Sequence, residues 1–91
     1  IPPIIIIQGD HGPSVSIVTP EMRMSILNAY YVNDETKSKL YGTITPVNSF
    51  RIIFNNYFGT TYPLLEDKSY HAYGEGQFTP EYLVPNTCVT P

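Results

Sequence analysis

The sequence is short of charge and of cysteine, and both shortages narrow what the protein can do. Charged residues fill 14% of the 91 positions, against about a quarter in an average soluble domain, so part of the surface is expected to be apolar. Only five residues are Lys or Arg, they form no cluster, and the net charge is −3, which argues against nucleic acid as a partner. The single cysteine, Cys88, excludes an internal disulfide, and we expect it to be inert.

Long apolar runs are also missing. The longest aliphatic stretch is Ile4–Ile7, whereas a membrane-spanning helix needs about 20 apolar residues. Tryptophan is absent, but eight Tyr and four Phe are present, and such aromatic side chains suit protein interfaces. The length allows one small domain, and a start without Met is typical of a processed or excised segment.

The stretch Ile4–Ile7 predicts a strand that is buried on both faces. Its β-branched residues are continuous and show no alternation with polar ones, which is typical of a central strand in a mainly parallel sheet covered by helices. Parallel neighbours arrive through long crossovers, and nothing before Ile4 supplies them. The sequence therefore predicts an α/β fold, of which residues 1–91 form a single partial domain.

Residues 46–58 give the clearest helix prediction. Thr45 is a suitable N-cap, Pro46 fits the first helical position, and Gly59 fits the position after the last turn. Between them apolar residues recur at helical spacing and are expected to pack against a sheet. These residues are Val47, Phe50, Ile53, Phe54, Tyr57 and Phe58.

The remaining segments give weaker patterns. Thr19 and Pro20 have the features of a helix start, but residues 24–32 alternate and are rich in strand formers, so we expect a strand there. Residues 33–40 predict a polar loop. From residue 60 onward Pro and Gly are frequent and predict an irregular tail with one short strand near residues 69–72.

Asp10 and His11 follow the apolar strand directly and are the candidate metal ligands. In open α/β sheets, functional groups lie beyond the carboxyl ends of strands, and a carboxylate with an imidazole is an ordinary ligand pair for Zn²⁺ or Mn²⁺. The flanking glycines keep side-chain bulk away from a bound anion. Taken alone, the residue types favour Asp10 as a turn cap and His11 as a surface residue, and it is the context that favours a metal site.

The strand that ends in Gly9-Asp10-His11-Gly12 resembles the second metal-ligand motif of the alkaline phosphatase superfamily. That superfamily includes sulfatases, phosphonate and phosphodiester hydrolases and lipoteichoic acid synthase-like transferases. The order of the later elements is similar to that of the sulfatase-like branch: a strand opening with Arg23, a loop, and a helix that begins with a polar residue and Pro and ends in Gly. The resemblance covers about residues 4–71.

The resemblance implies that the chain is the C-terminal fragment of an alkaline phosphatase-like sandwich. Asp10 and His11 would bind a divalent metal, either Mn, Zn, Ca or Mg, and Arg23 would contact the substrate anion, although a surface or ion-pairing Arg is the alternative. No catalytic residue is assigned here, because family members supply the nucleophile from a region before this motif, and Cys88 lacks the Cys-x-Pro-Ser-Arg pattern of a formylglycine precursor. No His follows the motif before His71, which favours the single-metal branch.

Two functions are therefore expected from the sequence. The first is the metal-binding C-terminal part of a sulfatase-like hydrolase of sulfate or phosphate esters, inactive alone, whose partner is the missing N-terminal part of the same catalytic domain. The resemblance also implies an extracytoplasmic, membrane-tethered parent protein. The alternative is a stand-alone, non-enzymatic protein-interaction module, which includes self-association through exposed strand edges.

Overall fold

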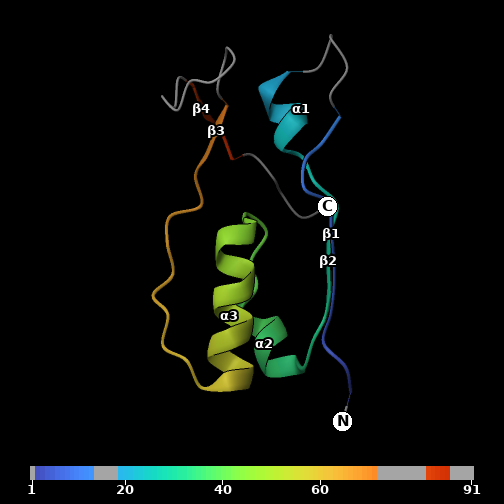
Figure 1. Ribbon diagram of the computed structural model, residues 1–91, viewed down its shortest axis with the longest axis vertical. Coiled ribbons are helices and arrows are strands. Elements are labelled where there is room, and N and C mark those ends of the chain that lie inside the picture. The colour runs from blue at the N-terminus through green and yellow to red at the C-terminus, as the bar shows by residue number, and fades with distance from the viewer. Residues whose placement is uncertain (1, 14–18, 72–81, 87–91) are drawn as a thin grey trace.

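The computed structural model describes residues 2–13, 19–71 and 82–86, which form three helices and two small antiparallel sheets (Figure 1). In chain order the elements are β1 (Ile5–Gln8), α1 (Pro20–Met24), β2 (Asn28–Tyr31), α2 (Asp34–Lys39), α3 (Pro46–Phe58), β3 (Ser69–His71) and β4 (Tyr82–Val84). This part of the chain is thus a small mixed α/β domain. The larger alkaline phosphatase-like sandwich stays a prediction.

β1 is an exposed strand with a single antiparallel neighbour among the described residues. It pairs with β2 so that Ile5 lies opposite Tyr31. Ile5 and Ile7 are 44% and 56% exposed, while Ile6 and Gln8 are half-buried. The prediction of a strand buried on both faces in a parallel sheet is wrong, because β1 pairs antiparallel with β2 and the helices α2 and α3 lie on one side of this two-stranded ribbon (Figure 1).

The segment from Pro20 to Tyr31 contains a short helix before its strand. The hydroxyl of Thr19 accepts a hydrogen bond from the N–H of Met22 at 3.2 Å, and Pro20 occupies the first turn, so the helix-start signal prevails there. The strand predicted over residues 24–32 is confirmed only for Asn28–Tyr31.

Residues 33–40, predicted as a loop, contain α2. The side chain of Asn33 accepts a hydrogen bond from the N–H of Thr36 at 2.8 Å and caps the helix. Two acidic residues lie in the first turn and two lysines in the last, which suits the helix dipole. The polar composition therefore reflects a short capped helix rather than a loop.

The predicted helix at residues 46–58 is confirmed as α3, and Gly59 after it has the left-handed φ of 68°. Its buried face agrees with the predicted apolar stripe only at Ile53. The fully buried residues of α3 are Asn48, Ser49, Ile52 and Ile53. Three phenylalanines of the predicted apolar stripe, Phe50, Phe54 and Phe58, are at least 40% exposed, and we call them the aromatic ridge. The buried face meets α2 and, through a hydrogen bond between Ser49 and Tyr30, β2.

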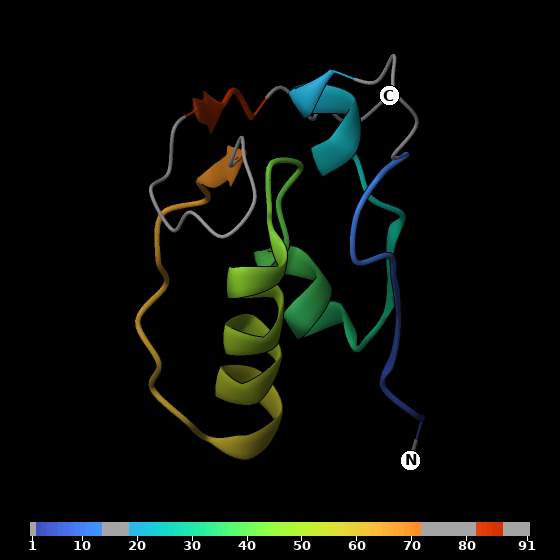
Figure 2. The same ribbon diagram turned by 45° about the horizontal axis from the view of Figure 1, so that its top comes forward.

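An extended segment, residues 60–67, runs along α3 on the side opposite β1 and β2 (Figures 1 and 2), and we call it the strap. Asn55 donates to the carbonyl of Tyr62 and accepts from its N–H, both at 2.8 Å. Asn48 binds both backbone groups of Leu65 in the same way, at 2.7 and 2.9 Å. Asn48 and Asn55 are seven helical residues apart, about 10.5 Å, and Tyr62 and Leu65 are three extended residues apart, about 10 Å. The spacing of the two asparagines therefore equals the spacing of the two strap residues that they bind.

Apolar packing is sparse in this fold. Among the described residues the fully buried hydrophobic ones are Ile52, Ile53 and Val84. The radius of gyration is 15.0 Å, against about 12 Å for a compact domain of this length. The accessible surface is 6854 Å², against about 5,400 Å² expected for a protein of this mass. Large hydrophobic side chains such as Leu27, Phe58 and Leu64 are more than half exposed, in agreement with the apolar surface expected from the low charge. None of the described helices is long and apolar enough to cross a membrane.

We expect Asn48→Ala to lower the free energy of unfolding by about 2–3 kcal/mol, because the fully buried Asn48 side chain bonds both backbone groups of Leu65 and also donates to Tyr41 and Asp67. Asn55→Ala removes the matching pair of bonds to Tyr62 and one bond from the Thr60 hydroxyl, but at a half-buried side chain where water replaces them, and is expected to cost less than about 1 kcal/mol. Urea denaturation followed by circular dichroism measures both losses. Equal losses would contradict the role given to burial at Asn48.

Candidate functional site

The structure brings the three predicted site residues together at one end of the β1–β2 hairpin. Asp10 and His11 lie just after β1, and Arg23 lies in α1 on the returning arm. The N–H of Gly12 donates to the carbonyl of Arg23 at 2.6 Å. This bond holds the loop after β1 against the last turn of α1, so that residues twelve positions apart become neighbours.

Gly12 makes this approach possible. A Cβ atom at this position would lie 2.1 Å from the carbonyl oxygen of Met22 and 2.8 Å from that of Ser25, which is closer than nonbonded carbon and oxygen atoms come. Its φ is not positive, so the requirement for glycine is one of space rather than of backbone conformation. Any side chain here would push the loop away from α1.

The imidazole of His11 has two neighbours at one nitrogen. Nδ1 lies 2.6 Å from the carbonyl oxygen of Gly12 and 3.1 Å from Nη1 of Arg23. One nitrogen cannot donate to the carbonyl and accept from the guanidinium at once. Since an unprotonated nitrogen would repel a carbonyl oxygen at 2.6 Å, we assign the proton to Nδ1. Nε2 then keeps its lone pair, as a metal-binding imidazole requires.

Asp10 and His11 fit two positions of a metal site. Oδ1 of Asp10 lies 3.6 Å from Nε2 of His11, close to the roughly 3.4 Å that separates two ligands of one tetrahedral Zn²⁺. Both side chains are accessible, with exposed fractions of 92% and 46%. Without a metal, the same contact is an ion pair only when His11 carries a second proton, and its exposure then gives it little energetic weight.

The pair does not complete a metal site. Catalytic metals usually have three protein ligands, and within residues 2–13, 19–71 and 82–86 no group of three or more His, Cys, Asp or Glu side chains is placed to hold an ion. His71 lies in β3 and is not among the residues that line the site. Cys88 lies outside the described residues.

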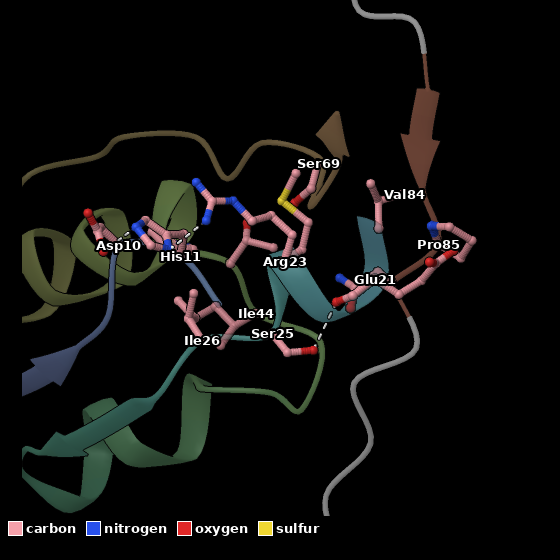
Figure 3. A pocket seen from close by; sticks show the side chains of 14 residues that line it. Asp10, His11, Glu21, Arg23, Ser25, Ile26, Ile44, Ser69, Val84 and Pro85 are labelled. Carbon is pink, nitrogen blue, oxygen red and sulfur yellow. Dashed lines mark hydrogen bonds and ion pairs between the residues drawn. The ribbon is translucent and has the colours of Figure 1, made fainter. Parts of the chain in front are cut away.

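A cavity of about 430 Å³ opens beside these residues. Figure 3 shows Asp10 and His11 at one end, Val84 and Pro85 at the other, and Arg23 between them. The volume lies within the range of small-molecule sites. The remaining lining residues come from α1, from the segment that leads into α3, and from β3 and the chain after β4: Glu21, Met24, Ser25, Ile26, Ile44, Thr45, Pro46, Ser69 and Asn86. The cavity therefore has Asp10 and His11 at one end, a second carboxylate residue, Glu21, toward the other, and a mixture of apolar and uncharged polar residues elsewhere.

Asp67 is a half-buried residue that accepts several hydrogen bonds, and the sequence did not predict its role. Its Oδ1 accepts hydrogen bonds from the N–H of Thr45 at 2.8 Å, from the Thr45 hydroxyl at 2.6 Å and from Asn48 at 3.2 Å. Its Oδ2 accepts from the hydroxyl of Tyr41. We call these four residues the latch. No spacing rule finds Asp67, because its partners lie 19–26 residues away in the sequence.

The latch shifts the pKa values of both its ionisable members. Burial raises the pKa of Asp67, but the hydrogen bonds from Thr45, Tyr41 and Asn48 together outweigh burial and hold this pKa below its ordinary value. The pKa of Tyr41 is raised, first by burial and then by its bond to Asp67. The latch thus favours an ionised Asp67 beside a protonated Tyr41.

Comparison with protein-family models, with curated proteins and with solved structures finds no match to this chain. The resemblance to the sulfatase-like branch therefore rests on the sequence pattern alone. The geometry around Asp10, His11 and Arg23 is the second basis for a functional proposal.

We expect Gly12→Ala to displace the loop from α1 and to lower the free energy of unfolding by about 1–3 kcal/mol, the usual range for overpacking. Gly9→Ala is the matched control, because a Cβ at Gly9 would meet its nearest atoms at 3.7 Å, an ordinary contact. NMR spectra of the His11 ring and the Arg23 side chain, recorded with urea denaturation, follow both effects. Spectra of Gly12→Ala that superpose on those of the wild type would contradict the steric argument.

Proposed function

We propose that this chain supplies the metal-binding loop of a sulfatase-like hydrolase that acts on sulfate or phosphate esters. Asp10 and His11 would be two ligands of a divalent cation, and Arg23 would contact the anionic group of the ester. The observation that carries this proposal is that these three residues, selected from the sequence, line one cavity of about 430 Å³.

The charged lining residues are Asp10, Glu21 and Arg23, and Arg23 is the one that would bind an anionic ligand beside the cation. A carboxylate and a neutral imidazole suit Zn²⁺ or Mn²⁺ better than they suit Mg²⁺ or Ca²⁺, which prefer oxygen alone. The guanidinium of Arg23, permanently charged, would oppose a bare cation beside His11. It would attract a sulfate or phosphate group, which Arg binds through two parallel hydrogen bonds. The arrangement therefore suits binding of an anion at a metal more than storage of a metal.

The proposal requires a partner that completes the site. The further metal ligands and the nucleophile are proposed to come from the N-terminal part of the same catalytic domain. The accessible surface, larger than the mass predicts, supports such a partner, because apolar side chains are available for its packing. The chain alone is then inactive, and no residue in it receives a catalytic role.

We expect Zn²⁺ to bind the isolated chain weakly, with a Kd near about 1 mM, a binding free energy of about −4 kcal/mol, because only two ligands are available. NMR titration would show shifts at His11. His11→Ala is expected to abolish them and His71→Ala to leave them unchanged. Aryl phosphate and aryl sulfate are expected to show no turnover. Robust turnover, or Zn²⁺ binding that survives His11→Ala, would overturn the proposal.

Arg23→Gln serves as a second control in this titration, since it separates the two roles given to the site. Removal of one positive charge beside the cation is expected to tighten Zn²⁺ binding about 2–5-fold and to weaken binding of inorganic phosphate. A variant that weakens both would show that Arg23 only supports the local fold.

A non-enzymatic interaction module is the second candidate function, and the aromatic ridge favours it. The ring centroids of Phe50 and Phe54 are 6.1 Å apart and those of Phe54 and Phe58 6.0 Å apart. The ring of Tyr62 in the strap lies 6.4 Å from Phe54 and extends the row. All four side chains are at least 40% exposed, and contiguous exposed aromatic surface is typical of protein contact sites.

If the ridge is such a contact site for a second copy, the chain forms a discrete dimer that Phe54→Gln converts to a monomer. Tyr70→Gln is the control, because Tyr70 is similarly exposed, at 48%, but lies in β3. Size-exclusion chromatography with light scattering at about 100 µM, well above the Kd of a micromolar complex, measures the mass. A monomeric wild type excludes self-association through the ridge, and a dimer without Zn²⁺ binding at His11 favours the interaction module over the hydrolase.

A further inference from the structure

We propose that Asp67 is a positioning residue that closes the strap against the N-terminal end of α3 and so fixes one wall of the cavity. The inference concerns regulation of the site described above, and its meaning for catalysis rests on the proposed function. The latch itself is a property of the fold and can be tested without a metal or a substrate.

Hydrogen bonds, rather than apolar burial, hold the strap. Its three large hydrophobic side chains, Tyr62, Leu64 and Leu65, are 46–52% exposed. The attachments include the paired bonds of Asn55, those of Asn48, the bond from Arg51 to the carbonyl of Pro63, and the bonds of Asp67 at the end of the strap. Segments with exposed backbone bonds and few buried apolar contacts open at low free-energy cost. If one of these attachments is removed, the strap is therefore expected to open first at that point.

Asp67 is the attachment closest to the cavity. Thr45, whose N–H and hydroxyl both donate to Asp67, lines the cavity together with Pro46. Two residues after Asp67, Ser69 begins β3 and lines the cavity from the other side. Asp67 thus joins two lining segments that belong to different elements, and its release would separate them. Because β3 pairs with β4, the wall at Val84 would move with Ser69.

Asp67 is also the attachment that responds to pH, because the asparagine amides do not ionise. Tyr41 is the ionisable group that faces it, and Arg51 of α3 donates to the carbonyl of Pro63 at 3.1 Å. Glu66 and Lys68 flank Asp67 in the sequence and pair with each other at 2.7 Å, with side chains at least 47% exposed. Glu66 and Lys68 therefore form an ion pair with each other and are not members of the latch.

The sign of the pH effect follows from the direction of the shift. The pKa of Asp67 is lower in the folded chain than in the unfolded chain. Its stabilising contribution is therefore fully present above the unfolded value, about 4, and is lost as the pH falls through the lower folded value. The pKa of Tyr41 is raised, so its contribution is lost only when the pH rises above about 10. The latch is closed throughout the neutral range.

The experiment compares Asp67→Asn with Glu66→Gln, which removes the neighbouring exposed carboxylate and leaves the latch intact. Amide hydrogen exchange is measured by NMR. In Asp67→Asn, exchange at Thr45 and Leu65 is expected to accelerate at least about tenfold, the effect of losing a charge-assisted hydrogen bond. Exchange at Tyr62, held by Asn55, is expected to stay unchanged, and Glu66→Gln to behave as the wild type throughout. Unchanged exchange at Thr45 and Leu65 would overturn the proposal.

If Asp67→Asn fails to fold, the wild type is titrated from pH 7 to pH 2.5 instead. Loss of the native Leu65 signal at a higher pH than the Tyr62 signal supports the latch, and simultaneous loss overturns it. Binding of inorganic phosphate, read from the Arg23 side chain, tests the link to the cavity. Weaker binding in Asp67→Asn than in Glu66→Gln supports the link, and equal binding removes it. A wild type that binds no phosphate refutes the proposed function, while the exchange data still decide the latch.

Discussion

Hydrogen bonds from the side chains of α3 and of Asp67 hold together a chain that buries little apolar surface. The residues with the least exposure in the described part include Thr36, Asn48 and Ser49, all polar and all 0% exposed. Every buried side-chain polar atom in those segments has a partner. A buried polar group stabilises a fold only when it is fully paired, and it then specifies one arrangement of its neighbours. Here that arrangement is α3 between the β1–β2 hairpin and the strap.

The candidate site is a consequence of this arrangement. The hairpin delivers Asp10, His11 and Arg23 to one end of the molecule, and Gly12 makes their approach possible. The strap delivers β3 to the same end from the opposite side of α3 (Figure 2). The cavity therefore depends on two polar connections that lie far apart in the sequence. One is the hydrogen bond between Gly12 and Arg23, and the other is the set of bonds from Thr45 to Asp67. Asp10, His11 and Arg23 come from the hairpin, and Ser69 of β3, which follows the strap, forms part of another wall.

The sequence predicted the structural features that depend on residues close together in the chain. Pro46 and Gly59 marked the ends of α3 because caps and breakers act within one turn. The run Ile4–Ile7 led to the wrong prediction of a buried strand. The burial of a strand depends on which elements cover it, and the composition of the strand does not contain that information. Asn48 and Asp67 were not recognised as structural residues, since their partners are distant in the sequence. The site residues were recognised from a resemblance, and their spatial proximity depends on Gly12.

Asn48 and Asn55 of α3 fix the length of the strap between Tyr62 and Leu65. At Tyr62 and Leu65 they bond to backbone atoms only, so the fit at these two positions does not depend on which side chains stand there. It does depend on the number of residues between them, since one extra residue would shift the second pair by about 3.3 Å, a full residue step. In this segment, length is constrained more tightly than composition. Substitutions between the two asparagine contacts are therefore tolerated where insertions and deletions are not.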